Sequence, residues 1–189
     1  MRKSTPFVYN PLNLEHDPRT EMIPTIFRRF EGIWRGEGVG EFPPRVAPFQ
    51  YIEELVIKPL SKPNVWECRS QTRNKVTDKP MHIETGFMRA HPGEPQGECG
   101  RVEFVISHPF GLAEVSQGNY TSDMIEVTCR SEGFSRVATA TPPQVTELRR
   151  VYRFVVAEDG CSYLEFLFEM GTTLTAMQTH LVAKLKKVA

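Results

Sequence analysis

The stretch Val102-Glu103-Phe104-Val105-Ile106-Ser107-His108 shows the pattern that decides the fold of this chain. Side chains two residues apart lie on the same face of an extended chain. One face of this stretch therefore carries Val102, Phe104, Ile106 and His108. An apolar face with this period is typical of a strand with one buried side. The stretch predicts a β-strand whose apolar face ends in a histidine.

Nine further stretches show a similar pattern, and turn signals such as Asp159-Gly160 separate them. No helical pattern of about 10–15 residues lies between them, so consecutive strands should pair antiparallel. The nine stretches are residues 34–42, 49–57, 65–72, 81–88, 112–117, 125–130, 148–156, 163–170 and 180–187.

Ten strands in 189 residues, without a repeat or a linker, favour one meandering sheet that closes on itself and so has no open edge. We predict an all-β protein: an antiparallel up-and-down β-barrel of about ten strands, similar to lipocalins and fatty-acid-binding proteins. About eight strands leave room for side chains or one small ligand, and ten leave more. A ligand cavity is therefore expected.

One short helix is expected before the first strand. Apolar residues recur there at spacings of three and four, Pro24 fits a first turn, and Gly32 ends the pattern. A helix this short is not stable alone, so its apolar side should cover the barrel as a lid or plug. We expect an irregular arm over residues 1–20 and a barrel domain over residues 21–189. The apolar residues of the helix are Met22, Ile23, Ile26, Phe27 and Phe30.

Charge and hydropathy exclude several classes of partner. The 23 Lys and Arg residues balance the 23 Asp and Glu residues, so no field draws the chain to nucleic acid or to an anionic membrane. No apolar run approaches the roughly 18 residues of a membrane span, and the N-terminus lacks the apolar centre of a secretory signal. We expect a cytoplasmic protein, with the nucleus left open.

The four cysteines, Cys68, Cys99, Cys129 and Cys161, lie about thirty residues apart. This spacing excludes the paired cysteines of a zinc ribbon. In a protein that is not exported, they are expected to be reduced thiols in or near strands.

The stretch from Gly32 to Gly40 alternates glycine with larger residues and contains Trp34. Glycines on one strand face allow a close backbone approach, and Trp34 would anchor the floor of the barrel. A phosphate-binding loop needs a preceding strand and a following helix. Here a helix precedes and a strand follows, which argues against nucleotide binding.

Several motifs, in this order along the chain, resemble the nitrobindins, a family of haem-binding β-barrels that also forms the C-terminal domain of a THAP-type zinc-finger protein. The resemblance covers residues 25–188, and no zinc finger is present. The motifs are Gly32-x-Trp34-x-Gly36-x-Gly38, Phe42-Pro43, Phe49-x-Tyr51-x-Glu53-Glu54, Lys79-Pro80-Met81-His82-x-Glu84-x-Gly86-Phe87, Gly111-Leu112-x-Glu114-Val115-x-x-Gly118, Met170-x-Thr172-Thr173 and His180-Leu181.

The resemblance implies a ferric haem b with His180 as its proximal ligand and catalytic residue, binding of nitric oxide, and isomerisation of peroxynitrite to nitrate. The chain contains no C-x-x-C-H motif, so covalent attachment of the haem is excluded. From alternation alone His180 is ambiguous, because it shares a face with Lys184 and Lys186. If the start of the strand lines the cavity, His180 can face the iron while Leu181 packs outside or under the helix.

Four more residues are cofactor-binding candidates. Met170 continues the apolar face of residues 164–168 and matches a cavity-lining methionine of the family. Met81 and His82 match a pair near the haem, but neighbours on a strand point to opposite faces unless a bend intervenes. We expect Met81 to pack, and whether His82 touches the distal side stays open. His108, where relatives carry glutamine, could donate a hydrogen bond there or bind iron.

Two other functions stay open at this point. One is an intracellular carrier of a fatty acid or other apolar ligand, without catalysis. Such a site would need a buried Arg or Tyr for a carboxylate, and Arg150, Tyr152 and Arg153 are candidates. Alternation places Tyr152 and Arg153 on different faces, which weakens this alternative. A nitric oxide sensor that signals to a partner would use the same haem without turnover. A homodimer is also left open.

Overall fold

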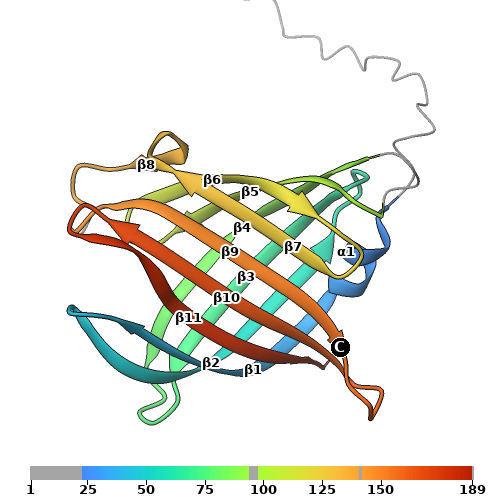
Figure 1. Cartoon of the computed structure of the whole chain (residues 1–189), viewed down its shortest axis with the longest axis horizontal. Helices are drawn as coiled ribbons and strands as arrows, with labels where there is room; N and C mark the ends of the chain where they lie inside the picture. Colours follow the sequence, from blue (N-terminus) through green and yellow to red (C-terminus); the bar gives the residue numbers. More distant parts are fainter. Residues whose placement is uncertain (1–22, 94–97, 141, 189) are drawn as a thin grey trace, which may run out of the picture.

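Ten strands follow one another around a closed ring, each hydrogen-bonded antiparallel to its neighbours (Figure 1). We describe them in a computed structural model, for residues 23–93, 98–140 and 142–188. The ring closes where β11 pairs with β1, which confirms the predicted up-and-down barrel. Its strands are β1 (Gly32–Phe42), β2 (Val46–Pro59), β3 (Val65–Asn74), β4 (Pro80–Pro92), β5 (Gly100–His108), β6 (Leu112–Tyr120), β7 (Met124–Arg130), β9 (Val145–Val156), β10 (Ser162–Thr172) and β11 (Thr175–Lys187).

An additional strand was not predicted. β8 (Phe134–Arg136) follows a 3-10 turn at Ser131–Gly133 and pairs with the first part of β6. The last part of β6 pairs instead with β7. Three residues are too few to show a two-residue period, so the sequence pattern could not reveal β8.

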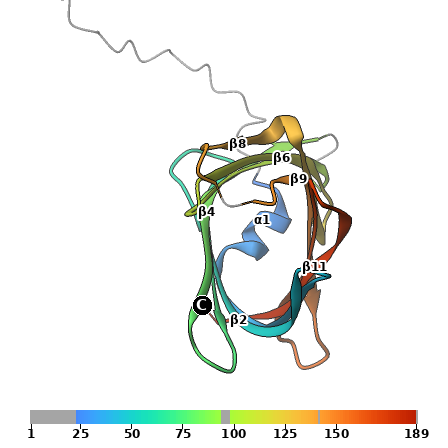
Figure 2. The same cartoon turned by 90° about the vertical axis from the view of Figure 1, so that its left-hand side faces the viewer.

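The helix α1 (Thr25–Phe30) closes one end of the barrel, as Figure 2 shows by looking along the interior from the other end. Its apolar residues are buried, and Phe27 stacks on Trp66 of β3 with ring centroids 4.4 Å apart. The predicted plug is therefore present. Pro24 precedes the helix as its N-cap instead of lying in its first turn. The expected arm and Met22 lie outside the described residues.

The glycine-rich start of β1 permits the close approach that its sequence indicated. Gly32 has a φ of +125°, a conformation that favours glycine, at the junction of α1 and β1. A side chain in place of Gly38 would collide with the ring of Tyr51, and one in place of Gly36 with the backbone carbonyl of Lys184. These motif residues let β1 coil tightly between its neighbours.

All four cysteines have free thiols, as expected, and Cys68 and Cys129 are buried. In the part of the chain that the structure describes, no helix is long and apolar enough to cross a membrane.

Replacing Trp34 by alanine should lower the free energy of unfolding by about 3–5 kcal/mol. Trp34 is 0% exposed, and its Nε1 donates a hydrogen bond of 2.7 Å to the carbonyl of Phe30. Urea unfolding followed by circular dichroism measures the loss. Trp34→Phe, which keeps much of the ring but not the N–H, should lose less. Equal losses in the two variants would contradict packing as the main cause.

Candidate functional site

A cavity of about 370 Å³ lies inside the barrel, toward the end opposite α1. Most of its wall is apolar. We call the part toward α1, where the charged side chains of Glu84, Glu114 and Arg150 lie, the base of the cavity. The structure therefore brings together all five residues that the sequence singled out for a cofactor. They are Met81, His82, His108, Met170 and His180.

A β-bulge in β11 turns His180 into this cavity. Phe168 of β10 faces Leu181, the next residue Glu169 faces Thr179, and His180 is therefore an extra residue without a partner across the pair. Both His180 and Leu181 line the cavity as a result. The expectation that Leu181 packs outside was wrong, because simple alternation fails at the bulge.

The ring of His180 is oriented by the backbone of β1 and by aromatic neighbours. Its Nδ1 lies 2.8 Å from the carbonyl oxygen of Glu41. A carbonyl can only accept, so Nδ1 carries the proton and the lone pair of Nε2 is left for a ligand. Burial lowers the pKa of His180 below its ordinary value, against an opposing contribution from the Glu41 carbonyl. The aromatic rings around it belong to Phe42, Phe49 and Phe168.

A second bulge explains how two adjacent residues, Met81 and His82, both line the cavity. Gln71 of β3 faces Ile83 of β4, but Arg73 faces Pro80, so Met81 and His82 together oppose one residue, Thr72. The backbone N–H of His82 donates to Thr72 Oγ1 at 3.1 Å, which supports the irregular backbone. The bend that both side chains required is present, and Met81 is 44% exposed.

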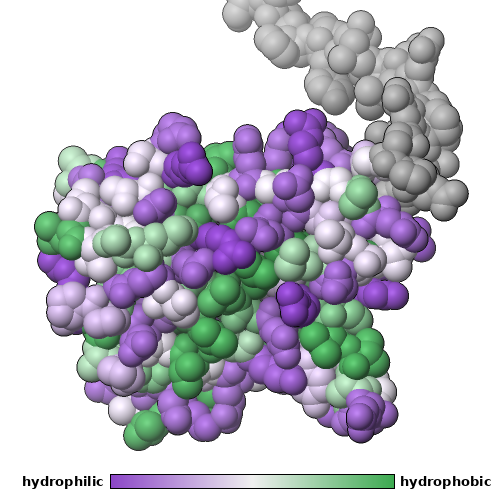
Figure 3. Space-filling view, viewed as in Figure 1, coloured by the Kyte–Doolittle hydropathy of each residue, from purple (hydrophilic) through white to green (hydrophobic). Residues whose placement is uncertain are grey.

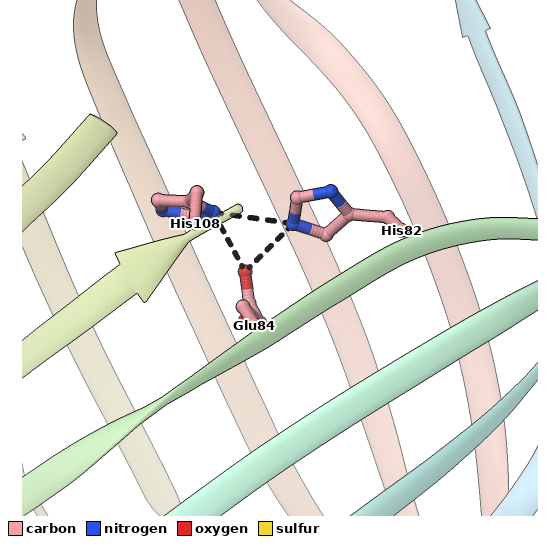
Figure 4. Close-up of side chains that lie close together, drawn as sticks. All are labelled: His82, Glu84 and His108. Carbon is pink, nitrogen blue, oxygen red and sulfur yellow. Dashed lines mark hydrogen bonds and ion pairs between the residues drawn. The ribbon is translucent and has the colours of Figure 1, made fainter. Parts of the chain in front are cut away.

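His82 and His108 meet inside the cavity, next to Glu84 (Figure 4). His82 Nε2 lies 3.1 Å from His108 Nδ1 and 3.5 Å from Glu84 Oε2. The ring of Phe110 stacks on His108 with centroids 5.3 Å apart. His108 ends the inner face of β5, as predicted, and its side chain is only 6% exposed.

Arg150 of β9 forms the base of the cavity with two carboxylates that the sequence analysis did not single out as site residues. Its Nη1 donates to Glu84 Oε1 at 2.7 Å, and its Nε donates to Glu114 Oε1 at 3.1 Å. Burial raises the pKa of Glu84, but Arg150 and His82 outweigh this effect and hold it well below its usual range. Two carboxylates around one guanidinium leave the base one negative charge in excess.

Glu53 of β2 is also buried in the wall of this cavity. The pKa of Glu53 is raised to about 7, mainly by burial. The hydrogen bond from Ser70 opposes this rise, and the charge of Glu84 adds to it. Its Oε1 accepts that hydrogen bond at 2.8 Å, and its Oε2 is buried without a partner among the described residues. A protonated carboxyl group suits this environment better than a carboxylate.

Residues 26–187 match the family described as the THAP4-like, heme-binding beta-barrel domain. The chain belongs to this family. The match spans the whole barrel, including the bulges that bring His180 and His82 into the cavity. The family that the ordered motifs predicted is thus confirmed, whereas the role of each residue toward the haem stays a prediction.

The chain is also similar to proteins that are named peroxynitrite isomerase. The chain is 36% identical over 159 residues to peroxynitrite isomerase of Mycobacterium leprae (strain TN), covering 82% of this chain and 89% of that protein. It is 36% identical over 160 residues to peroxynitrite isomerase 1 of Mycobacterium tuberculosis (strain H37Rv), with the same coverage. The crystal structure of Rv2717c from M. tuberculosis superposes with a TM-score of 0.68 at 31% identity, covering 89% of this chain and 100% of that one.

Glu53 should make the protein less stable as the pH rises from about 4.5 to about 7. In this range the folded chain keeps a proton on Glu53 that the unfolded chain releases, so raising the pH favours unfolding. The rise in the pKa of Glu53 corresponds to a loss of about 3 kcal/mol in the free energy of unfolding across this range. Urea unfolding at several pH values should show this slope in the wild type but not in Glu53→Gln. Glu54→Gln, an exposed neighbour, is the control and should keep it; an unchanged slope in Glu53→Gln contradicts the prediction.

Proposed function

We propose that this chain binds ferric haem b through His180 and, in that form, isomerises peroxynitrite to nitrate. The observation that carries the proposal is the imidazole of His180, held by the Glu41 carbonyl inside the cavity with Nε2 left to bind a metal. A hydrogen bond of this kind on the other ring nitrogen is typical of metal-binding histidines. The names of the relatives support the activity.

Bound haem would supply an iron centre with an open position for a small ligand, at which peroxynitrite can rearrange. The protein contributes the surroundings. The rings of Phe42 and Phe168 lie 5.4 and 6.0 Å from the ring of His180, between centroids, and limit how far it can turn. His82 and His108 line the same cavity and add polar ring nitrogens to its wall.

The base of the cavity argues against a carrier of fatty acids. Arg150 is the buried cation that a fatty-acid carboxylate would need, but its N–H groups already donate to Glu84 and Glu114. A further carboxylate would also meet the excess negative charge there. Arg153, the other arginine considered, is exposed on the outer wall.

Replacing His180 by alanine should abolish a sharp Soret band on titration with haemin and return peroxynitrite decay to the rate without protein. His91→Ala is the matched control, because His91 pairs with Glu103 on β5 and does not line the cavity. Absorption spectra and stopped-flow decay measure the two effects. Full haem loading and decay in His180→Ala would falsify the assignment, whereas normal loading without turnover in the wild type would indicate a nitric oxide sensor.

We also propose a homodimer through the outer wall of β1, β9, β10 and β11. A hollow of about 600 Å³ opens there, and an apolar row crosses the four strands in register. Figure 3 shows apolar surface running over β9, β10 and β11. Beside it runs a row of alternating charges that a two-fold axis can pair with itself. The apolar row is Val151, Leu167, Val182 and Val39, and the charged row is Arg153, Glu165, Lys184 and Glu37.

Light scattering coupled to gel filtration should give twice the chain mass for the wild type and the monomer mass for Val182→Glu. Val182 is 45% exposed in the apolar row, so a carboxylate there would be buried in the dimer. The control is Val76→Glu, in the turn after β3, where the side chain is 85% exposed. A monomeric wild type, or dimers in both variants, would contradict this interface.

We place the protein in the cytoplasm, with the nucleus also accessible to it. Four free thiols support a reducing compartment.

A further inference from the structure

We propose that His82, Glu84 and His108 form a second metal site, separate from His180, that binds a divalent transition-metal ion such as Zn²⁺. Three donor atoms converge there from β4 and β5 (Figure 4). They are His82 Nε2, His108 Nδ1 and Glu84 Oε2. Two imidazoles and one carboxylate, with a position left for water, are a ligand set used by zinc and ferrous sites.

The spacing of the three atoms fits a single ion between them. The two nitrogens are 3.1 Å apart, and Glu84 Oε2 lies 3.5 Å from His82 Nε2 and 3.6 Å from His108 Nδ1. Zinc bonds of about 2.0–2.1 Å in a tetrahedron place any two ligand atoms about 3.4 Å apart. The side chains therefore need to move only by tenths of an ångström to bind an ion.

The surroundings of His108 can accommodate the tautomer that metal binding needs. Its Nε2 lies 3.5 Å from Glu114 Oε2, and both atoms are buried without a hydrogen-bond partner among the described residues. With the proton on Nε2 facing this carboxylate, the lone pair of Nδ1 points toward His82 and Glu84. A carboxylate on the far nitrogen of a metal-binding histidine is the usual supporting arrangement. Glu114 is thus a positioning residue.

The charge at the base of the cavity also favours a cation. Arg150 orients Glu84 through two hydrogen bonds of 2.7 and 3.1 Å, yet each carboxylate oxygen has a second lone pair for a metal. Glu84 and Glu114 together exceed Arg150 by one negative charge. The side chain of His82 is 37% exposed, so an ion can reach the site from the cavity. Two imidazole ligands favour a transition metal over Ca²⁺ or Mg²⁺.

Titration of the full chain with Zn²⁺, against a chromophoric chelator, should show one equivalent bound with and without haem. His82→Ala and His108→Ala should each weaken binding by about tenfold or more, whereas His91→Ala should not. Thermal melts establish that the variants fold. His180→Ala should keep zinc binding while losing the haem band, so the two proposals fail independently.

Co²⁺ gives a second measurement, because its visible bands are stronger in a tetrahedral site than in solution. These bands should be present in the wild type and in His91→Ala and absent from both cavity variants. Zinc binding that is absent from the wild type, or that persists unchanged in folded His82→Ala and His108→Ala, overturns the proposal. In that case the two histidines are only a hydrogen-bonded pair.

Discussion

The pairing of β11 is the constraint on which the rest of the molecule depends. This strand bonds to β10 on one side and to β1 on the other, and so closes the ring. Its register with β10 shifts at two places, and at the shift between Phe168 and Glu169 the extra residue is His180. The same bulge places the imidazole beside the carbonyl of Glu41, just beyond the paired part of β1. The strand that closes the barrel therefore also orients His180, the candidate haem ligand.

The buried charged cluster around Arg150 is the second feature that holds the barrel together and shapes the cavity. A guanidinium that is 3% exposed would strongly destabilise the fold without partners, and it has two carboxylates. These come from β4 and β6, so the cluster links three strands that are not neighbours in sequence. It also determines which ligands the cavity tolerates, because it holds excess negative charge next to two histidines.

The sequence could predict the barrel because the alternation of apolar and polar residues along a strand can be recognised within the strand itself. Each of the ten barrel strands contains its predicted stretch, and His108 lies on the face that its strand assigned to it. The bulges at His82 and His180 could not be predicted, because a bulge exists only in relation to the partner strand. The resemblance to a family, and not the pattern, identified His180.

The carboxylates of the site were missed for a different reason. Glu84 and Glu114 occupy inward positions that a hydropathy argument assigns to apolar residues. Their burial is tolerable only because Arg150 lies between them, 66 residues from Glu84 and 36 from Glu114. One signal was available: three charged residues at inward positions of different strands, with signs that nearly cancel, indicate a buried ion cluster.

The stacking of α1 on Trp66 limits how molecules enter and leave the barrel. Because the helix fills one end of the barrel, a cofactor, an oxidant and a departing product all share the opposite opening. Anything large that binds in the cavity narrows this opening for smaller molecules. A bound molecule of that size would also shield the buried charges around Arg150 from solvent.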